Sequence, residues 1–506
     1  MDAKSIVIIG GGVSGALVAT HLLRQASTPL RIVIVERTPP IGRGVAYGTD
    51  CPDHLLNVPA SRMGAFPNEP DHFYKWVAAR VGRPTFPQTV SPADFLPRTL
   101  YGQYIYSVLM EARNAAAKDV VFESVAGEAV DIEEKPEGVQ VILSDGRALA
   151  ASRVVLALGN LPGEYPIRKS SQFFHGSRYV HVPWIDDALA GIRPEDEVLI
   201  VGAGLTAADI ITQLVHQGHR GTIHALSRRG LKPQVQRLGP PYRNFLAGQT
   251  LPATARQMLH LVRNEVRTAV RNGLDWQAVV DALRPHTAAI WRNWSLAERA
   301  RFLRHLRPFW EAHRHRFAAQ TGTQLETLRA SGQLKFYAGR LQSLTDAGSS
   351  AEAAFRHRGT ENVTTLHVAK VINCTGPRSD YSKYQHPLFI NLLARGLIDH
   401  DPLALGLNAN ADGELFRYRG KPSGWLLTLG APLKGVLWEC TAVAEIRVQA
   451  RALSARLIAS LDESIEFASS SAASLPGPSA AGGLSYSARI QSSDTPWNSR
   501  PLFAAH

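Results

Sequence analysis

Apolar residues gather at two places along the chain in the same order: a short continuous run, a glycine-rich turn, a longer periodic run and a second short run. The first place is residues 6–36, where the run 6–9 meets three consecutive glycines. Short continuous β-branched runs are typical of strands buried on both faces, and the period of residues 16–23 predicts a helix. The second place is residues 197–229. The pattern therefore predicts an α/β fold with two Rossmann-like units.

The first unit carries the motif Gly-x-Gly-x-x-Gly from Gly10 to Gly15. Gly10 permits a tight turn, Gly12 lets the backbone approach a pyrophosphate, and Gly15 lets the helix lie close to the strand. The phosphates then meet the free N–H groups at the start of the helix, beside Ser14. Glu36 ends the second strand, where a carboxylate binds a ribose 2′-hydroxyl. The acid favours FAD or NAD over NADP, and we predict FAD in this unit.

The second unit has the related motif Gly-x-Gly-x-x-Ala, formed by Gly202, Gly204 and Ala207. Arg228 and Arg229 follow its second strand, at the place where the first unit has its acid. A guanidinium pairs with a 2′-phosphate through two hydrogen bonds, whereas an acid would repel it. We therefore predict NADPH here. The alternative is that the two arginines are exposed turn residues that bind nothing.

Each unit continues with three short runs that predict a β-meander, and then with an apolar strand that ends at a glycine. These glycines are Gly159 and Gly376, and we expect both at the cofactors. A further strand, 425–429, ends at Gly430, and a helix over 442–461 follows it. We expect this segment to return to the first unit and to direct its helix N-terminus at the flavin. The meander runs are residues 120–122, 130–134, 139–143, 334–336, 353–356 and 364–368.

A helical insertion of about residues 254–330 interrupts the second unit, with predicted helices over 253–272, 276–283, 296–306 and 308–317. It is rich in arginine and histidine, most of all at residues 313–316. One interpretation is a solvated basic face. The other is that Arg314 or Arg316 holds an anionic substrate at the domain boundary. The histidines alternate with arginines that would repel a cation, so we predict no metal site.

These features predict four segments. Residues 1–190 form the first part of the FAD-binding domain, and residues 191–372 form the NADPH-binding domain with its insertion. Residues 373–465 return to the FAD-binding domain. Residues 466–506 are rich in serine, alanine, glycine and proline, and we expect them to be a disordered tail.

Composition restricts the partners. The net charge of +12 over 506 residues is compatible with anionic small molecules or with an ordinary solvated surface, and no nucleic-acid-binding motif accompanies it. No apolar run has transmembrane length, so we expect no membrane contact. Three widely spaced cysteines argue against a disulfide framework and favour the cytoplasm. The sequence makes no prediction about the oligomeric state.

The two predicted cofactors imply hydride transfer from NADPH to FAD. The chain has no Cys-x-x-Cys pair that could reduce a disulfide and no cysteine set for an iron–sulfur cluster. The electron acceptor is then dioxygen, a quinone or another small molecule.

Several short motifs outside the glycine turns suggest a family. They lie at residues 43–48, 55–60, 95–98, 101–102, 227–230, 310, 313–316, 435 and 438–439. With these motifs, residues 5–455 resemble the two-dinucleotide-domain flavoproteins that include the FAD-dependent urate hydroxylases and the L-aspartate N-monooxygenases. The resemblance implies a monooxygenase that uses a flavin (hydro)peroxide and dioxygen to hydroxylate a small, anionic substrate at carbon or nitrogen.

A more distant resemblance is to the class B flavin monooxygenases. Asn57 with Pro59 is similar to the loop that brings an asparagine to the flavin in that class, which implies a catalytic role for Asn57. The segment from Phe174 to His181 resembles the class fingerprint with altered spacing, so we interpret His181 as a packed linker residue. Two other functions stay open: an NADPH-dependent flavin reductase or oxidase, and a non-enzymatic flavoprotein redox sensor.

Overall fold

The computed structural model describes residues 4–136, 138–167, 170, 172–185 and 187–472. Of these residues, 4–460 form one compact body, and 461–472 belong to a separate one. The larger body holds both glycine-turn units and contains a six-stranded sheet, a seven-stranded sheet and a separate three-stranded sheet. Within the described residues, no helix has the length and apolarity needed to cross a membrane.

The six-stranded sheet is built around β1 (Lys4–Ile9), which pairs in parallel with β2 (Leu30–Glu36) and β7 (Arg153–Leu156). Residues 6–8 are completely buried, as their continuous apolar run predicts. The strand order is β15-β16-β7-β1-β2-β3. The remaining strands are β3 (Val120–Ala126), β15 (Glu414–Phe416) and β16 (Pro422–Thr428). Strands from both ends of the chain therefore share this sheet, because β16 pairs in parallel with β7.

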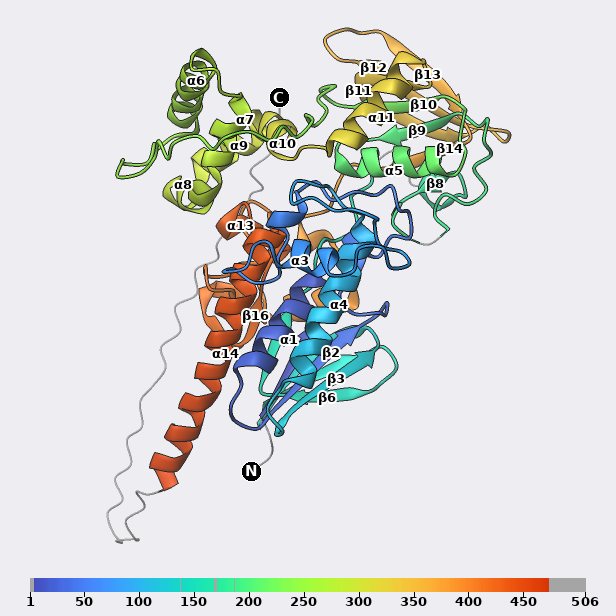
Figure 1. The fold of residues 1–506 in the computed structure, drawn as a ribbon. Coiled ribbons are helices and arrows are strands. Elements are labelled where there is room, and N and C mark those ends of the chain that lie inside the picture. The colour runs from blue at the N-terminus through green and yellow to red at the C-terminus, as the bar shows by residue number, and fades with distance from the viewer. Residues whose placement is uncertain (1–3, 137, 168–169, 171, 186, 473–506) are drawn as a thin grey trace, which may run out of the picture. The chain divides into compact units, whose positions relative to one another are not determined.

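Three helices lie beside this sheet in Figure 1: α1 (Val13–Gln25), α4 (Arg98–Asn114) and α14 (Val443–Ala472). The Ser454 hydroxyl of α14 donates to the Val18 carbonyl of α1, so the return segment packs on the helix that follows the first glycine turn. Short helices in the connecting segments are α2 (Gly44–Tyr47), α3 (His72–Ala78), α12 (Pro387–Ala394) and α13 (Lys434–Leu437).

The first meander differs from its prediction in one strand. Residues 120–122 were expected to open the meander, but they belong to β3, which pairs in parallel with β2 in the six-stranded sheet. The meander is instead β4 (Ala129–Lys135), β5 (Gly138–Leu143) and β6 (Ala148–Ala151), and α12 packs on β4. An apolar run indicates a strand but carries no information about its partner, which explains the error.

The seven-stranded sheet has the order β13-β12-β11-β10-β9-β14-β8. Strand β11 (Leu334–Asp346) pairs in parallel with β10 and then, at its far end, antiparallel with β12. Strand β8 (Tyr179–Val180) pairs with β14, so this linker segment lies in the second sheet although it precedes residue 190. The other strands are β9 (Val198–Val201), β10 (Ile223–Ser227), β12 (Ala351–His357), β13 (Val363–Val368) and β14 (Lys370–Asn373).

The insertion is helical, as expected. It consists of α6 (Ala255–Arg271), α7 (Trp276–Ala282), α8 (Thr287–Asn293), α9 (Leu296–His305) and α10 (Arg307–Arg314). The following helix, α11 (Ala319–Ala330), instead packs on α5 (Leu205–His216) in the core of the second sheet. Trp291 of the insertion stacks on Trp438 of the return segment at 4.9 Å and donates to the Gly435 carbonyl.

Helix α14 continues to Ala472, beyond the predicted end at residue 461. It therefore includes residues 466–472, where the sequence predicted the start of the tail. Residues 473–506 lie outside the described residues, so the tail prediction is untested there. The domain boundaries as a whole stay a prediction.

Candidate cofactor and active site

The first glycine turn leaves no room for side chains at two positions. Gly10 has φ +105°, and a Cβ there would lie 2.4 Å from the Ala157 carbonyl oxygen. A Cβ on Gly15 would lie 1.9 Å from the Gly10 carbonyl oxygen. Gly12 is the N-cap of α1 and has no side chain to cap the helix, so the first N–H groups of α1 face no capping oxygen. This arrangement fits a pyrophosphate at the N-terminus of α1.

Glu36 lies beside this turn. Its carboxylate accepts hydrogen bonds from the Gly11 N–H at 2.6 Å and from the Thr38 N–H at 2.8 Å. Two backbone donors fix the side chain at the carboxyl end of β2, next to the strand that leads into the turn. Each carboxylate oxygen has a second lone-pair site, so Glu36 can still accept from a ribose hydroxyl.

Two more predicted residues meet at the same edge of the sheet. Gly430 follows β16 with φ +74°, and a Cβ there would lie 3.5 Å from the Ser14 hydroxyl oxygen. Gly159 follows β7 with φ +61°. The carboxyl ends of neighbouring parallel strands form the usual ligand crevice of an open α/β sheet. The predicted FAD residues are therefore gathered at one edge, and they fit a dinucleotide.

The second glycine turn has the same local form. Gly202 has φ +124°, and a Cβ there would lie 2.1 Å from the Cys374 carbonyl oxygen. Gly204 is the N-cap of α5, again without a side-chain cap, and no non-neighbouring atom of the described residues lies within 4 Å of the position its Cβ would take. Ala207 is buried in the first turns of α5. Gly376 follows β14 with φ +91°.

The two predicted NADPH arginines are placed differently from each other. Arg228 is exposed at the end of β10, and Arg229 is half-buried with its guanidinium 5.7 Å from the centre of the Phe309 ring. Both follow the strand beside β9, whose carboxyl end leads into the second turn. The open turn and these guanidiniums fit a dinucleotide with a 2′-phosphate.

Asn57 is half-buried and lines a pocket built from both halves of the chain. Its other lining residues include Arg98 at the start of α4 and Leu205 and Asp209 of α5. The structure therefore brings Asn57 to the helix that starts at the second glycine turn. The pocket lining, complete, is Leu55, Asn57, Arg98, Leu205, Ala208, Asp209, Phe317, Ala318 and Thr321.

An ion pair that the sequence did not reveal lies in this pocket. Arg98 Nη2 is 2.8 Å from Asp209 Oδ2, and both side chains are largely buried. Burial raises the pKa of Asp209 to about 6, against the opposing effect of Arg98. His54 reaches the same helix, because its Nε2 lies 2.8 Å from the Asp209 carbonyl oxygen. Arg98 belongs to a motif noted above, but only the fold reveals its partner.

Arg314 lies among polar partners and not on a free basic face. Its guanidinium is 3.7 Å from the Glu439 carboxylate, both side chains are nearly buried, and its Nε has no hydrogen-bond partner within the part of the chain that the structure describes. Trp310 donates to the other oxygen of Glu439 at 2.8 Å. Two motifs from distant parts of the sequence thus meet at Glu439. A substrate-binding role for Arg314 stays a prediction.

Two further residues from the sequence motifs have packing roles. Arg316 is almost fully buried, forms an ion pair with Asp281 and lies over the Trp276 ring. His181 stacks on Tyr165 at 4.5 Å, and burial lowers its pKa. These contacts agree with the interpretation of His181 as a packed linker residue.

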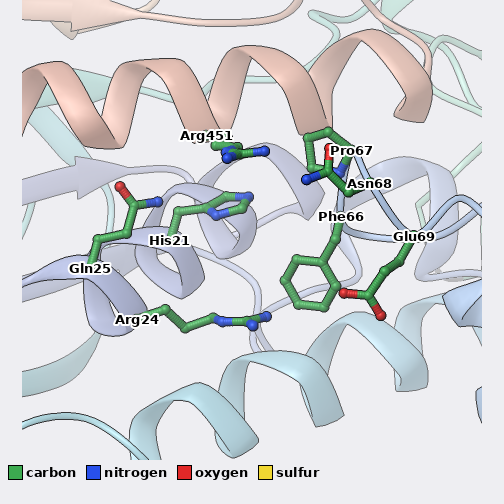
Figure 2. Close-up of a pocket in the computed structure, with 8 residues that line it drawn as sticks. All are labelled: His21, Arg24, Gln25, Phe66, Pro67, Asn68, Glu69 and Arg451. Carbon is green, nitrogen blue, oxygen red and sulfur yellow. The ribbon is translucent and has the colours of Figure 1, made fainter.

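A separate pocket of about 270 Å³ lies between α1, residues 66–69 and α14 (Figure 2). It includes His21, Arg24 and Arg451, and the Arg24 guanidinium lies 4.3 Å from the centre of the Phe66 ring. Burial, together with Arg24 and Arg451, lowers the pKa of His21 to about 4. None of the predicted site residues lines this pocket.

Comparisons with known proteins agree with this geometry. Residues 7–161 match a family model described as FAD-NAD(P)-binding. The chain is also similar to the nitrosuccinic acid synthase npaA of Aspergillus oryzae (strain ATCC 42149 / RIB 40), with 26% identity. That match covers 46% of this chain and 41% of the relative, so it spans less than half the length of either protein.

Solved structures show the fold. The ornithine hydroxylase PvdA from Pseudomonas aeruginosa, in its reduced form, has a TM-score of 0.58 at 15% identity, covering 91% of this chain and 100% of that one. L-lysine 6-monooxygenase from Pseudomonas syringae has a TM-score of 0.58 at 16% identity, covering 90% and 99%. The fold is the one these hydroxylases have. The prediction of an α/β fold with two Rossmann-like units is thereby confirmed. The family match supports the prediction of dinucleotide cofactors.

Proposed function

We propose that the protein is an FAD-dependent, NADPH-consuming monooxygenase that hydroxylates a small, anionic substrate at carbon or nitrogen. One observation carries this proposal: two open glycine turns in one chain, one followed by Glu36 and the other by Arg228 and Arg229. FAD, when bound, supplies a hydride acceptor and the means to activate dioxygen. The similarity to a named synthase and the fold shared with hydroxylases support this class of enzyme.

The residues of the chain then have distinct tasks. The first turns of α1 and α5 bind the two pyrophosphates, Glu36 binds a ribose, and the arginines after β10 bind the 2′-phosphate. Asn57 offers an amide that can donate and accept in the pocket beside α5. Trp291 and Trp438 stack in a buried apolar cluster that packs the insertion against the return segment.

The proposed substrate class rests on the positive charge of Arg314 and on the nitrosuccinic acid synthase reported above. The name of that relative contains nitrosuccinic acid, a four-carbon dicarboxylate that carries an oxidised nitrogen. We place this chain with the flavoproteins that include the urate hydroxylases and the L-aspartate N-monooxygenases, and we take aspartate as the first probe. A substrate carboxylate would compete with Glu439 for Arg314, whose Nε has no partner among residues 4–472 as far as they are described.

The test is a balance of three quantities in the FAD-loaded enzyme: NADPH consumed, hydrogen peroxide released and hydroxylated product formed. With aspartate, we expect product close to the NADPH consumed and little peroxide. If the peroxide released equals the NADPH consumed with aspartate, with urate and with other small anions, the oxidase or reductase alternative is supported. No oxidation of NADPH would contradict the two-cofactor proposal and favour the redox sensor.

The role of Asn57 has its own test. Asn57→Ala should shift the balance towards peroxide, because the amide that orients groups in the pocket is lost. Asn362→Ala is a matched control, since Asn362 is an exposed asparagine in a turn before β13. An Asn57→Ala enzyme that couples NADPH to product as well as the control rules out the catalytic role.

A further inference from the structure

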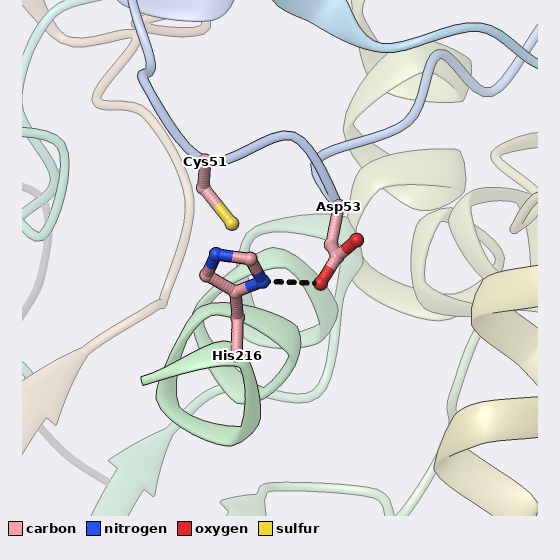
Figure 3. A group of neighbouring side chains, drawn as sticks. All are labelled: Cys51, Asp53 and His216. Atoms are coloured by element: carbon pink, nitrogen blue, oxygen red, sulfur yellow. Dashed lines mark hydrogen bonds and ion pairs between the residues drawn. The ribbon is translucent and has the colours of Figure 1, made fainter. Parts of the chain in front are cut away.

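Three side chains with metal-binding atoms meet away from the predicted cofactor residues. Cys51 and Asp53 come from the loop after α2, and His216 is the last residue of α5 (Figure 3). The thiol sulfur, a ring nitrogen and a carboxylate oxygen all lie within 4.8 Å of one another. Cys51 is buried and has a free thiol, whereas about half of the Asp53 and His216 side chains is exposed. The group is therefore open to solvent on one side.

The orientation of the imidazole suits a ligand. His216 Nδ1 lies 2.8 Å from Asp53 Oδ2, so the ring N–H donates to the carboxylate. Figure 3 shows the Cys51 sulfur on the opposite side of the ring, near the other nitrogen. Asp53 is about half exposed, so its carboxylate can leave this hydrogen bond and turn to a cation held between the Cys51 sulfur and the imidazole ring.

The loop is held in place by contacts that do not involve these three side chains. His54 binds Thr49 through Nδ1 at 2.7 Å and lies against the Asp209 carbonyl through Nε2 at 2.8 Å. Asp209 and His216 are seven residues apart on α5, so they occupy the same face, two turns along. The contact between His54 and the Asp209 carbonyl therefore holds the loop against α5 at the separation at which Cys51 faces His216.

The three donor types select a class of cation. A thiolate and an imidazole favour soft or borderline ions, whereas magnesium and calcium prefer oxygen ligands. Three protein donors with water in the remaining position are a common arrangement around zinc. One negative thiolate and one carboxylate would also neutralise a divalent charge.

We propose that Cys51, Asp53 and His216 bind a divalent cation of the zinc class, which cross-links the loop that leads to Asn57 with the helix that starts at the second glycine turn. The bound cation fixes α5 against this loop. It is expected to raise the melting temperature by about 2–4 °C at roughly hundredfold excess over Kd. The site stands independently of the reaction proposed above.

The decisive experiment uses zinc with the full-length, FAD-loaded protein. Equilibrium dialysis should give one equivalent of zinc per chain. X-ray absorption at the zinc edge should show one sulfur ligand at about 2.3 Å with nitrogen or oxygen ligands in the remaining positions. Cobalt(II) should give the visible bands of a four-coordinate thiolate site, at wavelengths longer than flavin absorption. These measurements need no variant.

Variants then assign the ligands. Cys51→Ser and His216→Ala should each weaken zinc binding at least tenfold, and Cys51→Ser should also remove the sulfur signal. His305→Ala is the matched control, because His305 is an exposed histidine at the last position of α9. Flavin content and circular dichroism show whether each variant is folded.

Two results would overturn the proposal. One is a zinc shell without sulfur in the wild-type protein, which would place any bound zinc at surface histidines or carboxylates. The other is a folded Cys51→Ser or His216→Ala protein that binds zinc as tightly as the His305→Ala control.

Discussion

The two glycine turns share a motif but differ at its third small residue. In the first unit this residue is Gly15, where a Cβ would lie 1.9 Å from the Gly10 carbonyl oxygen. In the second unit it is Ala207, whose methyl group is accommodated in the buried core of α5. The first helix thus lies against its turn with no spare space. The same motif can therefore tolerate a methyl group in one unit and exclude it in the other.

The strand that follows each helix shows a second difference. Glu36 is tied to the first turn by hydrogen bonds from Gly11 and Thr38, so it is part of the turn. Arg228 is exposed, and the Arg229 guanidinium lies 5.7 Å from the centre of the Phe309 ring. The first unit fixes its acid by hydrogen bonds to the turn, whereas Arg228 of the second unit is exposed. This difference suits one cofactor that stays bound and another that exchanges at each turnover.

The largest expected effect is at Gly15. In Gly15→Ala the new methyl group meets backbone, which cannot move aside as a side chain can, so α1 must shift away from the turn. Overpacking against side chains costs about 1–3 kcal/mol, and a contact of 1.9 Å with a backbone oxygen costs more than that range. We expect the purified variant to lose most of its FAD, measured as the ratio of flavin to protein absorbance.

The matched change in the second unit is Ala207→Gly, which removes a methyl group instead of adding one. It should retain FAD at the wild-type level. Equal flavin loss in both variants would remove the distinction between a tight and a loose turn.

Both glycine turns could be predicted from the sequence. A strand, a turn and a helix form from residues that are neighbours in the chain, so the patterns of residues 6–36 and 197–229 predict both units and their cofactor residues. The partner of β3, the sheet that receives β8 and the meeting of Arg314 with Glu439 depend on contacts between distant segments. A hydrophobic period indicates that a run is a strand, but it does not say which strand lies next to it. The Asp209 ion pair and the Cys51–His216 group were missed for the same reason.

The next largest effect concerns the ion pair that joins the two units. Arg98→Ala leaves the buried Asp209 carboxylate without its cation, and removal of one partner of a buried pair costs roughly 3–5 kcal/mol. Asp209→Asn should also destabilise the fold, because it leaves the largely buried Arg98 guanidinium without its anion. Urea unfolding of both single variants and the double variant gives the coupling energy. If the three variants have the same midpoint as wild type, the pair is not a link between the units.

The arginines after β10 test the second unit alone. Arg228→Ala and Arg229→Ala should each raise KM for NADPH about tenfold, because one charge-assisted contact to the 2′-phosphate is lost, and leave KM for NADH unchanged. Arg228→Ala should not alter stability, since the side chain is exposed. Steady-state rates with both nucleotides measure the preference. If KM rises equally for NADPH and NADH, the arginines do not contact the 2′-phosphate, and the alternative of exposed turn residues is correct.

The smallest expected effect tests how completely α1 is enclosed. Burial, Arg24 and Arg451 lower the pKa of His21 to about 4, below its value of about 6.5 in the unfolded chain. Between these two pH values the unfolded state binds the proton and the folded state does not. Stability from this residue is therefore complete above pH 6.5 and falls as pH drops towards 4, by about 3 kcal/mol over that range.

His21→Leu removes the titrating group without removing a hydrogen bond, because His21 Nε2 has no partner among the described residues. The variant should lose less stability than wild type between pH 7.5 and pH 5, measured as the shift in urea midpoint. His305→Leu, at an exposed helix end, should keep the wild-type slope. If the urea midpoint changes with pH equally in wild type, His21→Leu and His305→Leu, water reaches His21. The C-terminal half of α1 would then be no more enclosed than that of α5, which ends at the half-exposed His216. If the urea midpoint depends less on pH in His21→Leu alone, the tight packing of the first unit continues from its turn along the whole length of α1.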